Sequence, residues 1–177
     1  DSKHVSFLGT GYEKILLINS FSKTFAMTGW RIGYILSSNV EAISQVIKLQ
    51  YYITACSNDA MQYAVLTAFE EANDYPEEMA LEFKARRDII CSRLNQMPGV
   101  SCHVPKGAFY VFPKVTVEGM NSEQLAIELL KGGVLCSPGS AFGESGEGHL
   151  RFAYTTTREQ IELGMDKVEA VLMRLKK

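Results

Sequence analysis

Only two short apolar runs in the first third of the chain read as strands, which limits what this third can form alone. Residues 15–18 read as a buried strand and residues 31–36 as a second, separated by a polar loop that contains glycine. Two strands cannot form a stable sheet covered by helices, because each unpaired edge leaves a row of free amide and carbonyl groups. We therefore expect a remnant of a larger α/β sheet, truncated on its N-terminal side or completed by strands from elsewhere.

The remaining sequence divides near Tyr75 and Pro76 into two parts. Helical spacing and good N-cap residues predict two helices before this point, and Pro76 opens a third that ends at Pro98-Gly99. Short strand-like runs then alternate with one helix before a final amphipathic helix, where the spacing of Thr157 to Gln160 predicts a capping box. We expect residues 1–75 to be an α/β part and residues 76–177 to be a compact α+β domain. The predicted helices cover residues 40–49, 57–72, 76–97, 122–131 and 157 onward; the predicted strands of the second part cover residues 100–104, 108–115, 134–137 and 149–153.

Composition narrows the class of protein without identifying its chemistry. The formal net charge of the 177 residues is −2, with no block of like charge that would suggest nucleic acid or an anionic membrane as a partner. No apolar run approaches the roughly 20 residues that span a bilayer, and the first residues lack the apolar core of a signal peptide. We expect a cytoplasmic protein with reduced, mostly structural cysteines and no metal site. The residues behind this expectation are dispersed: Cys56, Cys91, Cys102, Cys136, His4, His103 and His149.

The most specific stretch is Ser20-Phe21-Ser22-Lys23, followed by Thr28-Gly29-Trp30-Arg31-Ile32-Gly33. A lysine in a tight loop after a strand can be shielded from water, and this favours the neutral amine that attacks a carbonyl. The hydroxyls of Ser20 and Ser22 with the guanidinium of Arg31 make a plausible cradle for a phosphate ester. A lysine nucleophile beside a phosphate site is the arrangement that pyridoxal phosphate (PLP) requires.

These residues resemble the Schiff-base signature of the class I and II aminotransferases of PLP fold type I. The resemblance implies that Lys23 forms the Schiff base and, once released by substrate, shuttles a proton between the substrate Cα and the cofactor. It implies that Ser20, Ser22 and Arg31 hold the phosphate. It also implies the fold: residues 1–75 as the C-terminal part of the PLP-binding large domain, followed by the complete small α+β domain, residues 76–177.

Two further motifs occur in the order and spacing of the same family. Residues 134–143 contain Ser137-Pro138-Gly139 and lead to Leu150-Arg151-Phe152, where the family has an arginine that clamps the substrate α-carboxylate. A planar guanidinium on a strand suits this role, because it binds a carboxylate through two parallel hydrogen bonds. Residues 105–112 resemble the Pro-x-Gly-Ala-Phe-Tyr turn and strand of the small domain.

The chain also departs from the family pattern. A PLP aminotransferase needs an acidic residue against the pyridine nitrogen, and none of the five aspartates follows a buried strand. In the family, that aspartate and the Gly-rich phosphate loop lie upstream of the lysine. So do most of the residues that one subunit of the homodimer contributes to the active site of the other. We expect a C-terminal fragment of a homodimeric enzyme, with little or no transaminase activity alone. The aspartates are Asp1, Asp59, Asp74, Asp88 and Asp166.

The resemblance leaves several functions open. The leading prediction is amino-group transfer between an L-amino acid and a 2-oxo acid, with the amino donor undetermined. A β-lyase or decarboxylating synthase on the same scaffold is an alternative, since one lysine and one arginine serve several PLP reactions. A third alternative is the ligand-sensing domain of a PLP-dependent transcriptional regulator.

Overall fold

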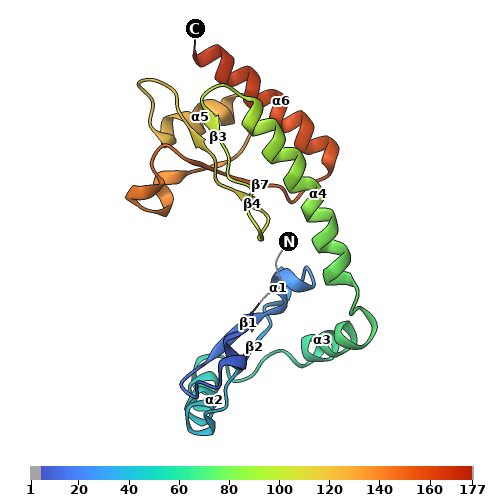
Figure 1. The fold of residues 1–177 in the computed structure, drawn as a ribbon. Coiled ribbons are helices and arrows are strands. Elements are labelled where there is room, and N and C mark those ends of the chain that lie inside the picture. Colours follow the sequence, from blue (N-terminus) through green and yellow to red (C-terminus); the bar gives the residue numbers. More distant parts are fainter. Residues whose placement is uncertain (1–4, 177) are drawn as a thin grey trace. The chain divides into compact units, whose positions relative to one another are not determined.

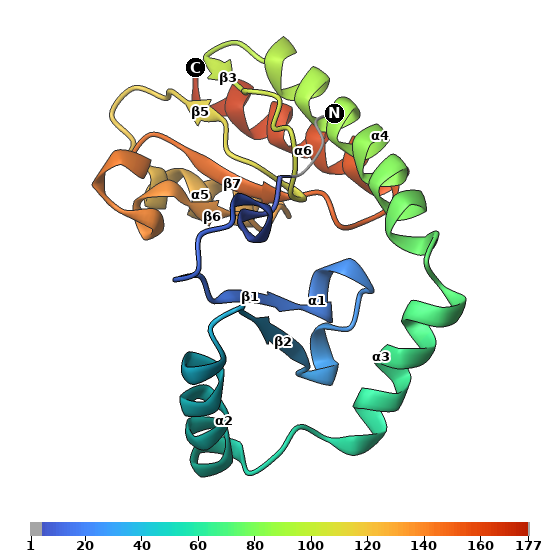
Figure 2. The ribbon, with the colours of Figure 1, turned by 60° about the horizontal axis from the view of Figure 1, so that its bottom comes forward.

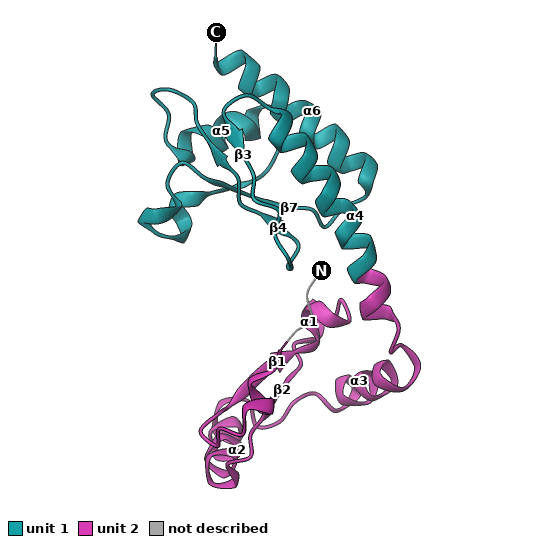
Figure 3. Ribbon diagram, viewed as in Figure 1, with its two compact units in different colours: residues 1, 80–177 teal, residues 2–79 magenta. Residues whose placement is uncertain are grey.

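The structure, a computed structural model, describes residues 5–176, so His4 and Asp1 lie outside the described part. The chain divides between Met79 and Ala80 into two compact units, which Figure 3 colours separately. We call them the N-terminal unit and the C-terminal unit. The division falls inside helix α4 (Tyr75–Gln96), four residues after the boundary at Tyr75 that the sequence predicts.

A single antiparallel hairpin is the framework of the N-terminal unit (Figure 1). Strand β1 (Leu17–Ser20) pairs with β2 (Gly33–Leu36), and Ser20 lies opposite Gly33. The two predicted strands are therefore present, each starting two residues later than expected. The loop between them is more ordered than the sequence suggests, because it contains the short helix α1 (Phe21–Thr24) and the 3-10 turn η2 (Thr28–Trp30).

Two helices complete this unit after the hairpin. Helix α2 (Val40–Thr54) begins at the N-cap Asn39 and helix α3 (Asp59–Glu71) at the N-cap Asn58, whose side chains accept hydrogen bonds from the first helical turns. A 3-10 turn, η1 (Phe7–Thr10), precedes the hairpin. The buried core is small and comprises Phe21, Met27, Ile32 and Val65.

Much of the apolar surface of the N-terminal unit is exposed. The prediction of a buried first strand is wrong within this unit: Ile18 is 74% exposed, because neither edge nor face of the hairpin is fully covered. Helix α2 buries no residue, and Tyr52 and Ile53 are 84% and 73% exposed.

The C-terminal unit is an α+β domain with one continuous core. Its three-stranded sheet is antiparallel with the order β4-β7-β6, and a second pair joins β3 to β5. The predicted strand over residues 108–115 is divided in two, because Pro113 has no N–H group and separates a strand that pairs with β7 from one that pairs with β3. The elements are β3 (Val100–Ser101), β4 (Tyr110–Val111), β5 (Lys114–Val115), α5 (Ser122–Lys131), β6 (Ser137–Pro138), η3 (Gly139–Phe142), η4 (Glu144–Gly146), β7 (Leu150–Ala153) and α6 (Arg158–Leu175).

Helices α4 and α6 lie side by side in both ribbon views (Figures 1 and 2). Ile90 and Leu94 of α4, Val168 of α6 and Phe152 of β7 share the core. At the surface Arg93 of α4 forms ion pairs with three acidic residues of α6, which fixes the alignment of the two helices. These partners are Glu162, Asp166 and Glu169. Among the described residues, no helix is both long enough and apolar enough to span a membrane.

Candidate functional site

The hairpin register brings the two ends of the lysine loop together. Ser20 lies opposite Gly33, and the Phe21 N–H donates to the Ile32 carbonyl at 3.3 Å. A Cβ on Gly33 would lie 2.6 Å from the Asn19 carbonyl oxygen, so only glycine allows this approach of the two strands. Ser20 and the residues just before Gly33 are therefore held at one end of the hairpin.

Hydrogen bonds inside the loop fix its shape further. The Ser20 hydroxyl accepts from the Ser22 N–H at 3.3 Å, and the Thr28 hydroxyl donates to the Ser22 carbonyl at 3.1 Å. Arg31 Nη1 donates to the Thr28 carbonyl at 3.1 Å. This chain of contacts links both predicted phosphate-binding serines to the predicted phosphate-binding arginine.

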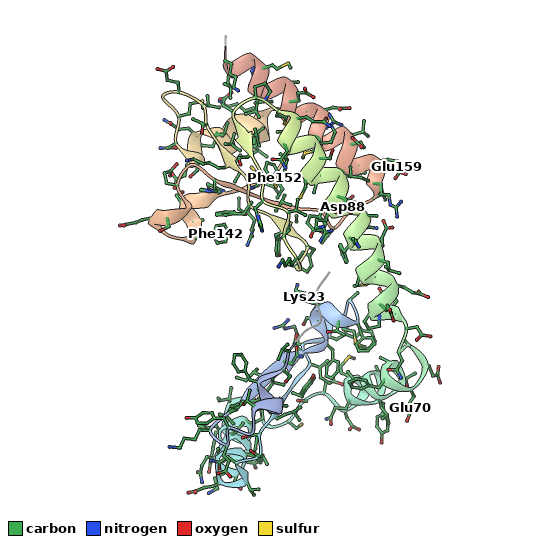
Figure 4. The ribbon with its side chains drawn as sticks, viewed as in Figure 1. Lys23, Glu70, Asp88, Phe142, Phe152 and Glu159 are labelled. Atoms are coloured by element: carbon green, nitrogen blue, oxygen red, sulfur yellow. The ribbon has the colours of Figure 1, made fainter. Side chains whose placement is uncertain are left out.

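Lys23 lies in α1 and its side chain is exposed (Figure 4). The helix is anchored by buried Phe21, whose ring lies 5.3 Å from the ring of Tyr34 and 5.5 Å from that of Phe69. Because Lys23 follows Phe21 by two positions on a helix, its side chain leaves on the face opposite the core. Sequence and packing together direct this amine away from the interior, so the shielding from water expected of this loop is not found within the N-terminal unit.

Arg31 adopts a left-handed backbone conformation, with φ of 54°. For a residue with a Cβ this conformation costs on the order of 1 kcal/mol, and such strain concentrates at functional positions. The hairpin on one side and η2 on the other hold it in place.

The groups of this loop fit PLP. Between Ser20 and Arg31 the chain carries a lysine and an arginine and no acidic residue. Two hydroxyls and a guanidinium are suitable donors for a dianionic phosphate ester, and a primary amine is the partner that an aldehyde requires.

The predicted carboxylate clamp, Arg151, lies on the central strand of the sheet in the C-terminal unit. It is opposite Ser137 in the ladder, and its Nη2 donates a long hydrogen bond of 3.4 Å to the Ser137 hydroxyl. Its guanidinium carbon lies over two aromatic rings, 4.5 Å from the centroid of Tyr110 and 4.4 Å from that of Phe142. Within residues 5–176 the half-buried Arg151 makes no ion pair.

The segment that carries Phe142 begins and ends with two glycines whose backbones lie against each other. A Cβ on Gly139 would lie 1.9 Å from the Gly146 carbonyl oxygen, so the two backbones touch where a side chain cannot fit. Glu147, the residue after this contact, ties the segment to Ser122. Its carboxylate accepts hydrogen bonds from the Ser122 N–H at 2.7 Å and from the Ser122 hydroxyl at 3.0 Å. Hydrogen bonds from the Gly148 and Ser122 amides hold the pKa of Glu147 below its ordinary value.

The other ionisable groups named from the sequence lie elsewhere. The ring of His149 stacks on Phe112 at 5.0 Å, and His103 is exposed. Asp88 and Asp166 form ion pairs with arginines of α4, while Asp59 starts α3.

The chain belongs to the aminotransferase class I and II family, whose model matches residues 2–168. It is 41% identical over 175 residues to an aspartate aminotransferase of Pyrococcus horikoshii, and the match covers 97% of this chain and 44% of that protein. It is 39% identical to aromatic-amino-acid aminotransferase 2 of Thermococcus litoralis, over 93% of this chain and 43% of that one.

Solved structures agree with this assignment. The aromatic aminotransferase of Pyrococcus horikoshii superposes with a TM-score of 0.90 at 38% identity, over 98% of this chain and 47% of that one. The fold is that of the fold type I aminotransferases. The chain spans about half the length of the relatives it matches.

The sequence motifs point to Arg151 but give no role to the two rings that contact it. Tyr110 stands in the Pro-x-Gly-Ala-Phe-Tyr motif, and Phe142 stands after Pro-Gly in the motif that leads to Arg151. Each ring therefore stands in a recognisable motif, but only the pairing of β4 with β7 shows that Tyr110 lies beside the strand of Arg151.

Proposed function

We propose that the complete protein carrying this chain is a PLP-dependent aminotransferase, which transfers an amino group between an L-amino acid and a 2-oxo acid. The observation that carries the proposal is the lysine loop, in which hairpin register and internal hydrogen bonds link Ser20, Ser22 and Arg31 around Lys23. Family membership supports the same chemistry. The site residues divide into a part that holds the cofactor and a part that holds the substrate.

Each residue has a role that its chemistry suits. The hydroxyls of Ser20 and Ser22 and the guanidinium of Arg31 bind the phosphate ester. Lys23 Nζ would hold the cofactor and would serve as the group that accepts and returns the proton of the substrate Cα. Bound PLP supplies the electron sink that makes this proton acidic. The guanidinium of Arg151 binds the α-carboxylate through two parallel hydrogen bonds and so fixes the orientation of Cα.

We further propose that residues 1–75 are part of the PLP-binding large domain, that residues 76–177 are the small domain, and that the protein is a cytoplasmic homodimer. The exposed apolar side chains of α2, Tyr51, Tyr52 and Ile53 among them, support an assembly that covers this helix. An amino acid and a 2-oxo acid are the expected small-molecule partners.

The test is a half-reaction with the complete protein loaded with PLP. An amino acid donor is added without an acceptor, and the product and the cofactor spectrum are followed together. An aminotransferase releases one 2-oxo acid per site and leaves the spectrum of pyridoxamine phosphate, and Lys23→Ala abolishes the conversion. Release of pyruvate together with ammonia would identify a β-lyase and contradict the proposal.

A further inference from the structure

To bind a carboxylate through two parallel hydrogen bonds, the guanidinium of Arg151 must be held in one orientation. Within the described residues its single hydrogen bond, to the Ser137 hydroxyl, is long at 3.4 Å. A bond of this length directs a side chain weakly. An arginine without firm contacts loses rotamer freedom when a ligand binds, and that loss weakens binding.

Two rings supply the missing constraint. The guanidinium carbon lies over Tyr110 at 4.5 Å and over Phe142 at 4.4 Å. Distances near 4.5 Å fit a planar cation resting its face on a ring, which leaves the N–H edge outside the contact. The N–H groups of this edge are the donors that bind a carboxylate.

The two rings are themselves fixed by different parts of the fold. Tyr110 belongs to β4, which pairs directly with the strand of Arg151. Phe142 comes from η3, in the segment between β6 and β7 (Figure 4). The close approach of Gly139 and Gly146 and the bonds of Glu147 to Ser122 make this segment a rigid mounting for an otherwise exposed ring.

Phe142 contributes little to the buried core. The residue is 49% exposed, whereas the buried core of the same unit is formed by other residues, such as Leu150 and Phe152. Besides lying against Arg151, its ring contacts Phe112, which is itself 41% exposed. A half-exposed ring held on a rigid segment against one arginine is an arrangement suited to positioning that arginine.

We infer that Tyr110 and Phe142 are positioning residues that hold the guanidinium plane of Arg151 and aim its N–H edge at the substrate carboxylate. The inference rests on the proposed function, because it takes Arg151 to be the carboxylate-binding group. It adds a specific claim: the rings act through Arg151 and through the planarity of its side chain.

The test measures carboxylate binding by titration calorimetry on the complete protein loaded with PLP. The probes are maleate and 3-phenylpropanoate, which carry carboxylates but no amino group and therefore bind without reacting. Phe142→Leu and Tyr110→Leu remove a ring, while Phe142→Tyr and Tyr110→Phe are matched controls that keep it. Because Phe142 is half exposed, leucine there leaves no buried cavity, and a thermal melt checks that each variant is folded.

Each ring-removing variant is expected to weaken probe binding about tenfold, and the ring-keeping variants to stay within about twofold of the parent. In an Arg151→Lys background, where no plane remains to be held, Phe142→Leu is expected to change affinity less than about twofold. Parent-like affinity in both leucine variants would overturn the inference, as would an undiminished effect of Phe142→Leu in that background. Unchanged affinity in Arg151→Ala would overturn the carboxylate clamp itself, and with it the inference, so the two failures are distinct.

Discussion

The close contact between Gly139 and Gly146 predicts that a single methyl group will disrupt the segment that carries Phe142. In Gly139→Ala the new Cβ would meet the Gly146 carbonyl oxygen at 1.9 Å and the His149 carbonyl oxygen at 2.6 Å, and both obstacles are backbone. Ordinary contact begins near 3.4 Å, so the two chain segments must separate by more than 1 Å. Gly139 also donates to the His149 carbonyl at 2.8 Å, and this hydrogen bond is strained by the same movement.

Overpacking of this kind costs about 1–3 kcal/mol, and a domain of about 100 residues loses roughly 4–8 °C of melting temperature for each kcal/mol. Urea denaturation and thermal melts followed by circular dichroism measure the change. Gly164→Ala is the matched control in the same unit, because Gly164 is a helical glycine in α6 and a methyl group there would meet no atom within 4 Å. That substitution should stabilise by up to about 1 kcal/mol. A Gly139→Ala protein that unfolds together with the parent would refute the packing argument.

Two further predictions concern ionisable groups. Burial raises the pKa of the Cys136 thiol to about 11, so iodoacetamide should label exposed Cys56 first, and labelling of Cys136 should keep rising with pH toward 11, as followed by peptide mass spectrometry. Equal labelling of both at about pH 8, near the ordinary thiol pKa, would contradict this. Hydrogen bonds from Arg158 and Arg86 lower the pKa of Glu82 from 4.5 to about 2, so its stabilising contribution is present above pH 4.5 and is lost as the pH falls toward 2. The difference in urea midpoint between parent and Glu82→Gln should therefore shrink over that interval, and a constant difference would show that the ion pairs are not its source.

The helices were predictable from the sequence because their signals are local. Asn39, Asn58 and Thr157 each cap a helix in the way their side chains allow, and all three helices begin within two residues of the expected position. A capping box was expected at Thr157, which accepts from the Gln160 N–H; the reciprocal box, with bonds in both directions, lies at Asn121 and Gln124.

The strands were less predictable because their limits depend on partners. Pro113 interrupts a continuous apolar run, and which side of it pairs with which strand is decided by residues far along the chain. Ile18 has the sequence of a buried strand residue but lies exposed, since burial depends on what covers the hairpin and not on the strand itself.

The same distinction holds for the candidate site. Lys23, Ser20, Ser22 and Arg31 lie in one short loop, so a motif could name them together. The contact of Tyr110 and Phe142 with Arg151 joins three separate segments of the chain. They meet only because of the strand pairing in the sheet and the close contact between Gly139 and Gly146.

If Lys23 holds the cofactor, as we propose, borohydride reduction should fix PLP on this residue. The complete protein is incubated with PLP, reduced with borohydride, digested and mapped by mass spectrometry. We predict that the phosphopyridoxyl mass is carried by the peptide that contains Lys23 and is absent from Lys23→Ala. A label on another lysine, or no label in the parent protein, would contradict this role for Lys23.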